Sequence, residues 1–246
     1  MDKSIAEEVY KELLCKNHPV NEIFVPTRAK WFDLCLEWGN KDDDAIKAHI
    51  KATTTQVYDD GRFKQNVYEI RTDNFYSDDA DIGCGAILRD SCGRPIAVWS
   101  SHVPEVERVS SFYHQLEGVS LGIKLAKKYE VPQFYMYCTS EDVAEFVMVS
   151  WGRRDASCTR RRLPNAVRSD HEKAYELIID IISDISELFS QGLSFFDVSW
   201  SERKETDGAY WLAKQGADKK MRLLEIRECE DLAECLYQDV FGLFLE

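Results

Sequence analysis

The order of strand and helix patterns across the middle of the chain restricts the fold more than any other feature. Three strand patterns follow one another, separated only by short segments rich in Gly, Asp or Ser, at residues 65–76, 82–90 and 96–103. The next patterns alternate: helix, strand, two helices, strand and helix, at residues 110–129, 133–139, 140–151, 170–190, 193–200 and 206–215. Tight turns join antiparallel strands and helical crossovers join parallel strands. The sequence therefore predicts an α/β domain with strands of mixed direction.

Two flanking regions are expected to be extensions of this domain. Residues 1–66 are predicted to be mainly helical, with apolar residues at helical spacing after Ser4 and a short helix near residues 42–51 behind three Asp residues. The run around Gly61 is interpreted as a turn between extended segments. Residues 217–246 form a C-terminal helical extension whose apolar stripe packs on its own domain or, as the alternative, docks on a partner. The predicted boundaries are 1–66, 67–216 and 217–246.

Charge and cysteine usage limit the partners and the compartment. The 246-residue chain has a formal net charge of -13, which repels nucleic-acid phosphates at long range. None of its 8 cysteines has CxxC spacing, so neither a zinc site nor a disulfide framework is indicated. No signal peptide or transmembrane segment is evident. We expect a reduced intracellular protein, cytoplasmic or nuclear, with no membrane partner, and its oligomeric state stays open.

Local motifs add a resemblance to this order of elements. The segments GCGAILRDSCGRPIAVWSS, LEGVSLGIKLAKKY, FYMYCTS and ERKETDGAYWLAKQG resemble the ribonuclease H-like domain common in plant retroelement-derived proteins. The resemblance covers roughly residues 67–216 and implies a mixed five-stranded sheet with flanking helices. It also implies hydrolysis of the RNA strand of an RNA–DNA hybrid. Four carboxylates hold two divalent ions in that family, because Mg²⁺ prefers oxygen ligands and the paired ions stabilise the attacking and leaving oxygens.

This sequence keeps one of the four carboxylates that the resemblance requires. Asp73 occupies the first position, whereas Gln115, Thr139 and Tyr210 occupy the other three. Asp207, one helical turn before Tyr210, is the possible substitute. The resemblance therefore predicts a catalytically inactive domain with no metal or other cofactor.

The alternative is an active hybrid endonuclease with a remodelled site. It requires Asp73, Asp207 and perhaps Glu141 to converge on Mg²⁺ or Mn²⁺. Under this hypothesis Asp207 faces the site rather than the outer side of its helix.

An arginine-rich stretch follows the helix pattern at residues 140–151 and stands where some members of the family carry a basic protrusion that grips the hybrid. Arginine pairs with phosphate or carboxylate in a bidentate manner, and Trp151 beside the stretch offers a stacking face. We interpret the stretch as a contact surface for nucleic acid or for an acidic protein partner, or as a solvated loop paired with acidic residues of the same chain. Its arginines are Arg153, Arg154, Arg160, Arg161, Arg162 and Arg168.

The aromatic residues near the end of the domain fall at strand and helix positions that are typical of a core. Phe195, Phe196, Trp200 and Trp211 are therefore expected to be buried.

Overall fold

The fold is described from a computed structural model of the chain. It describes residues 42–53, 55–57, 63–65, 67–76, 82–90, 93, 95–103, 110–153, 171–202 and 206–218. The predicted helices before residue 42, the predicted C-terminal stripe and most of the arginine-rich stretch lie outside these residues.

Seven strands and five helices make up the described part of the chain. The strands are β1 (Thr55–Val57), β2 (Phe63–Gln65), β3 (Tyr68–Tyr76), β4 (Ile82–Arg89), β5 (Pro95–Val103), β6 (Gln133–Cys138) and β7 (Phe195–Trp200). The helices are α3 (Asp43–Thr53), α4 (Ser111–Lys128), α5 (Glu141–Arg153), α6 (His171–Ser190) and α7 (Asp207–Ala217). Each element predicted between residues 65 and 216 is present within a few residues of its expected bounds.

Strand order and direction define the fold. β1 and β2 form a separate antiparallel pair, and the main sheet has the order β5-β4-β3-β6-β7. β3 pairs antiparallel with β4, which pairs antiparallel with β5, whereas β6 is parallel to both β3 and β7. This mixed five-stranded sheet with flanking helices is a ribonuclease H-like α/β fold, which confirms the predicted fold class.

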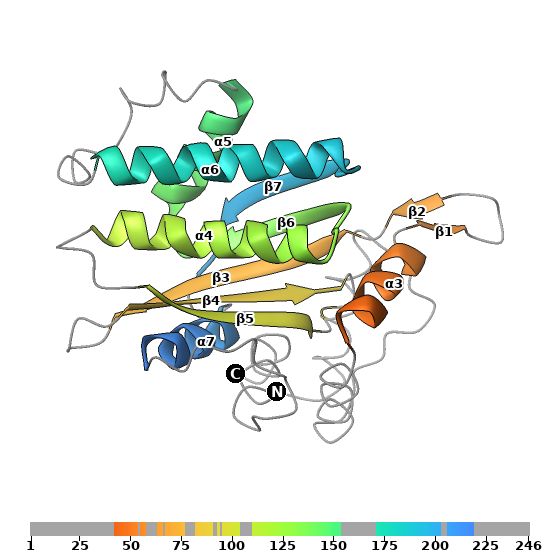
Figure 1. Ribbon diagram of the computed structural model, residues 1–246, viewed down its shortest axis with the longest axis horizontal. Coiled ribbons are helices and arrows are strands. Elements are labelled where there is room, and N and C mark those ends of the chain that lie inside the picture. Colours follow the sequence, from red (N-terminus) through yellow and green to blue (C-terminus); the bar gives the residue numbers. More distant parts are fainter. Residues whose placement is uncertain are drawn as a thin grey trace, which may run out of the picture.

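Helices cover the two faces of the sheet unequally (Figure 1). α4, α5 and α6 lie on one face, where Gly118 and Gly122 let α4 approach the side chains of Asn74 and Thr72. α7 lies on the other face and packs mainly on β3, β4 and β5. The hydrophobic core fills the layer between the sheet and the three-helix side, which is why residues such as Ile70, Leu116 and Met136 are fully buried there.

Part of the region predicted as an N-terminal extension packs into this core. Ile46 and Ile50 of α3 belong to the same buried cluster as the sheet. The hydroxyl of Tyr129, at the end of α4, donates a hydrogen bond to Asp43 Oδ1 at 2.8 Å. The predicted turn around Gly61 lies outside the described residues, but β1 and β2 flank it as an antiparallel pair with Val57 opposite Phe63.

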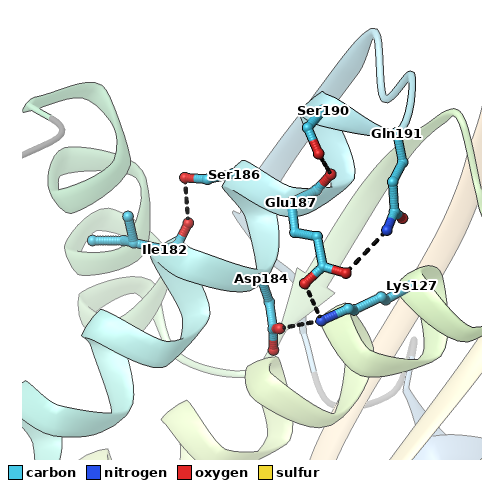
Figure 2. Close-up of polar contacts among 7 residues, drawn as sticks. All are labelled: Lys127, Ile182, Asp184, Ser186, Glu187, Ser190 and Gln191. Carbon is cyan, nitrogen blue, oxygen red and sulfur yellow. Dashed lines mark hydrogen bonds and ion pairs between the residues drawn. The ribbon is translucent and has the colours of Figure 1, made fainter.

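Figure 2 shows how α4 and α6 are joined at their exposed edge. Lys127 Nζ lies 2.8 Å from Asp184 Oδ1 and 2.6 Å from Glu187 Oε2. The hydrogen bonds from the ammonium to Asp184 and Glu187 raise the pKa of Lys127, against the opposing effect of burial. The three charged groups thereby fix the relative position of two helices whose buried sides already pack together, and they add little stability because they are partly solvated.

The predicted end of α6 at Gly192 is confirmed. Gly192 has a φ of +111°, a left-handed conformation that side-chain-bearing residues rarely adopt. The next amide, that of Leu193, donates to the carbonyl of Leu188 at 2.9 Å. The chain thus leaves the helix in a single turn and enters β7.

The expected burial of the aromatic residues is wrong at two positions. Phe196 is buried, but Phe195 is 38% exposed and Trp200 is 51% exposed. Both lie on β7, which is the last strand in the order of the sheet. An edge strand has a neighbour on one side only, so alternation along the strand does not secure burial for the residues at its ends. Trp211 is half-buried.

Candidate functional site

One edge of the sheet gathers the positions that the sequence singled out. Strands β3, β6 and β7 are mutually parallel, so their carboxyl ends meet at the same edge. Helices α5 and α7 begin just after β6 and β7, so their N-termini lie at this edge as well. In sheets of this type, ligands bind outside the carboxyl ends of the strands.

Asp73 of β3 is the centre of this site, and its carboxylate is surrounded by donors. Its side chain is on the α7 face and the residue is only 1% exposed. Oδ1 accepts hydrogen bonds from the Thr139 hydroxyl at 3.1 Å and from the backbone N–H of Asn74 at 2.8 Å. Oδ2 accepts from the Thr206 hydroxyl at 2.9 Å. A buried carboxylate requires such partners, because burial without them costs on the order of several kcal/mol.

The two threonines come from separate elements and give the site its shape. Thr139 follows the last residue of β6, and Thr206 is the N-cap residue of α7. The Thr206 side chain makes no capping hydrogen bond to its own helix and donates to Asp73 instead. The positive end of α7 also favours a negative charge at this place. Asp73 therefore ties together β3, the end of β6 and the start of α7.

The other two positions with replaced carboxylates, Tyr210 and Gln115, lie on two different helices. Tyr210 is one turn after Thr206 in α7, and its ring contacts Phe75 edge-on at 5.5 Å between centroids. Gln115 is half-buried in the first turns of α4, next to His114. The structure thus joins Asp73 directly to Thr139 and places Tyr210 against Phe75, two residues after Asp73 on the same strand. Gln115 lies on α4 beside His114, whose carbonyl accepts a hydrogen bond from Asn74.

Asn74, the residue after Asp73, holds the start of α4 against the sheet. Its Nδ2 donates to the carbonyl of His114 at 2.7 Å and lies 2.9 Å from Cys84 Sγ. A Cβ atom at Gly118 would be 2.8 Å from Asn74 Oδ1, so the asparagine fills the space beside α4 completely. No pattern in the sequence indicated this role.

The active alternative requires Asp207 and Glu141 to converge with Asp73. Asp207 and Glu141 are the first residues of α7 and α5, and both are exposed to solvent, whereas Asp73 is buried. Within the described ranges, no group of three or more His, Cys, Asp or Glu side chains is placed so that it could hold a metal ion.

The arginine-rich stretch begins at the end of α5. Arg153 is the last residue of that helix, and the remaining five arginines are outside the described residues. Trp151, which the sequence suggested as a stacking face, is partly engaged within the protein. Its ring stacks on Phe189 at 5.1 Å and contacts Phe196 edge-on at 5.6 Å, so one face of the indole is used within the protein.

Two cysteines lie close to the site and are buried. Burial raises the pKa of the Cys138 thiol to about 11. Burial also raises the pKa of Cys84 well above its usual range. Because thiolates rather than thiols react with alkylating agents, both side chains are chemically protected in the folded protein.

We therefore expect Cys84 and Cys138 to react with iodoacetamide at pH 8 only after unfolding. The measurement is mass spectrometry of peptides from native and urea-unfolded protein labelled for the same time. Fast labelling of either cysteine in native protein would contradict the burial described above.

No protein-family model matches the sequence, and no curated protein resembles it significantly. Solved structures are similar in fold. Ribonuclease H1 from the halophilic archaeon Halobacterium salinarum is 12% identical with a TM-score of 0.45, covering 62% of this chain and 98% of that one. The N-terminal RNase H domain of rv2228c from Mycobacterium tuberculosis is 16% identical with a TM-score of 0.44, covering 62% and 94%. LC11-RNase H1, solved in complex with an RNA/DNA hybrid, is 13% identical with a TM-score of 0.45, covering 62% and 98%. The fold assignment rests on the strand order and directions given above.

No helix in the described part of the chain is both long and apolar enough to cross a membrane.

Proposed function

We propose that the protein is a catalytically inactive ribonuclease H-like domain of the plant retroelement-derived type that binds nucleic acid without cleaving it. The observation that carries this proposal is the state of Asp73, whose two carboxylate oxygens accept hydrogen bonds from Thr139 and Thr206. Two metal ions at this edge would need several convergent carboxylates to offset their mutual repulsion. Here the hydroxyl of Thr139 replaces the third of the four expected carboxylates, and the phenol ring of Tyr210 replaces the fourth.

The hydrogen bonds also oppose a remodelled metal site. Asp73 already accepts three hydrogen bonds, which use most of the roughly four lone-pair sites of a carboxylate, so a cation would compete with these donors. Asp207, the candidate substitute, is exposed at the start of its helix. The site is therefore better suited to holding β3, β6 and α7 together than to holding an ion.

The cleavage assay tests inactivity directly. We expect no cleavage of a labelled RNA–DNA hybrid in Mg²⁺ or Mn²⁺ at protein concentrations in excess of substrate. Metal-dependent cleavage that disappears in Asp73→Asn would overturn the proposal and support the active alternative, whereas cleavage that persists in this variant would indicate a contaminating nuclease.

Nucleic-acid binding is proposed to use the arginine-rich stretch, residues 153–168, because the rest of the chain is acidic. The affinity for a hybrid should fall steeply with salt, since each neutralised phosphate releases counterions. Replacing Arg160, Arg161 and Arg162 with alanine should weaken binding and reduce the slope of log K against log salt by about 2 to 3. Fluorescence anisotropy over a salt series measures this slope. An unchanged slope in the triple variant would show that these three arginines do not contact the phosphates of the hybrid.

A further inference from the structure

Large exposed apolar side chains gather along one margin of the sheet. Six such side chains occur among the described residues, and four of them surround β7. Phe195 and Trp200 lie on β7 itself, Tyr135 lies on neighbouring β6, and Phe189 lies at the end of α6. Tyr135 contacts Phe195 at 5.1 Å between ring centroids, and Phe189 contacts Phe196 at 6.2 Å. Phe195 and Tyr135 lie on one face of this edge, whereas Trp200 and Phe189 lie on the face covered by α5. The four side chains therefore flank the β7 edge on both faces of the sheet, and we call this edge the β7 margin.

The two margins of the sheet differ in how they are protected. β5, at the opposite margin, contacts both α4 and α7, and it carries none of the large exposed apolar residues found in the described ranges. β7 pairs with β6 on one side, and no other strand among the described residues pairs with it on the other. Edge strands are usually protected by lysine, proline, bulges or covering elements. The residues of β7, FFDVSW, contain neither lysine nor proline.

The sequence of β7 is compatible with antiparallel pairing to a second copy of itself. In such a pair, opposite side chains share a face of the sheet. Centring the pair on Val198 places Phe196 opposite Trp200 on the face covered by α5. The same register places Asp197 opposite Ser199 of the second copy on the other face. Centring it on Asp197 would instead set two carboxylates against each other, which is unfavourable.

We propose that the β7 margin is a homodimer interface in which two copies of the chain join their sheets through antiparallel pairing of β7 about Val198. This pairing buries Trp200, which is 51% exposed in the single chain. It also satisfies the outward backbone N–H and C=O groups of the strand. The overlap is short, so the dimer is weak and its population depends on protein concentration. The inference goes beyond the proposed function and does not depend on nucleic-acid binding.

The test compares the mass of full-length variants in solution by size-exclusion chromatography with light scattering over about a hundredfold range of concentration. Wild-type protein should shift from the mass of one chain, 28.5 kDa, towards twice that value as concentration rises. Trp200→Lys should raise the dissociation constant at least about tenfold, because lysine on an edge strand opposes pairing. Ile179→Lys is the matched control: Ile179 is 42% exposed on α6, away from the β7 margin, and its replacement should leave the dissociation constant unchanged.

A second pair of variants tests the register. Ser199→Glu and Ser199→Lys both remove the hydrogen bond from the Ser199 hydroxyl to Asp197 Oδ2. Across the proposed dimer, however, Glu would face Asp197 of the second copy and weaken the association, whereas Lys would strengthen it. Circular dichroism checks that each variant is folded. A wild-type protein that stays monomeric, an equal effect of Trp200→Lys and Ile179→Lys, or tighter association of Ser199→Glu than of Ser199→Lys would each overturn the proposal.

Discussion

Replacing Gly85 with alanine is expected to destabilise the protein by about 3 kcal/mol or more, at the upper end of the range for overpacked cores. A Cβ atom at this position would lie 2.0 Å from the carbonyl oxygen of Ala209 and 2.7 Å from the amide nitrogen of Ala213. These are backbone atoms of α7, so no side chain can move aside and the whole helix must shift. Such a shift would also pull Thr206 away from Asp73, because Thr206 stands at the N-cap position of the same helix.

Urea denaturation of Gly85→Ala and wild-type protein measures this loss. Gly152→Ala is the matched control, because Gly152 is an exposed residue of α5 and a Cβ atom there would meet no other atom within 4 Å. In a helix this substitution should stabilise the protein by about 0.5 kcal/mol. A destabilisation below about 1 kcal/mol for Gly85→Ala would show that α7 does not pack as closely on β4 as described.

The second large effect concerns Asp73. We expect Asp73→Ala to lower the free energy of unfolding by about 3 kcal/mol, because it removes the carboxylate that accepts hydrogen bonds from the Thr206 and Thr139 hydroxyls. A carboxylate that belonged to a cluster of metal ligands would behave in the opposite way. Without metal, its removal would relieve repulsion between like charges and leave stability unchanged or increased.

The sign of the change in the free energy of unfolding, measured for Asp73→Ala without metal, therefore separates a structural Asp73 from a catalytic one. Asp207→Ala is the control for loss of charge near the same helix end, and because Asp207 is exposed its effect should remain within about 0.5 kcal/mol. A double-mutant cycle with Thr206→Val should show strong coupling to Asp73→Ala, since the two groups share one hydrogen bond. Increased stability of Asp73→Ala would count against the structural role and favour the active alternative.

These two predictions depend on different parts of the site. Gly85 governs whether α7 lies close to the sheet, and Asp73 governs whether the start of α7 is attached to β3 and β6. Loss of either should expose the edge of the sheet where the proposed relict site lies. Substitution at the β7 margin, as in Trp200→Lys, should in contrast weaken dimer formation and leave the stability of the single chain nearly intact.

The order of elements was predictable because it depends on local patterns. Alternating apolar residues identified β3 to β5, helical spacing identified α4, and Gly192 marked the end of α6. Short turns and helical crossovers then determined which strands are antiparallel and which are parallel. The retention of Asp73 and the replacement of its expected partner carboxylates were likewise visible in the sequence, through its resemblance to a known family.

The role of Asp73 was decided only by the tertiary structure. Thr206 lies 133 residues further along the chain, and no local pattern indicates that its hydroxyl leaves its own helix to bind Asp73. The exposure of Phe195 and Trp200 also escaped prediction, because periodicity shows which face a strand residue occupies but not whether the strand has a neighbour on both sides. The sequence by itself thus determined the type and order of the elements. Long-range packing determined which side chains meet, because those contacts depend on the closure of the sheet and helices rather than on neighbouring residues.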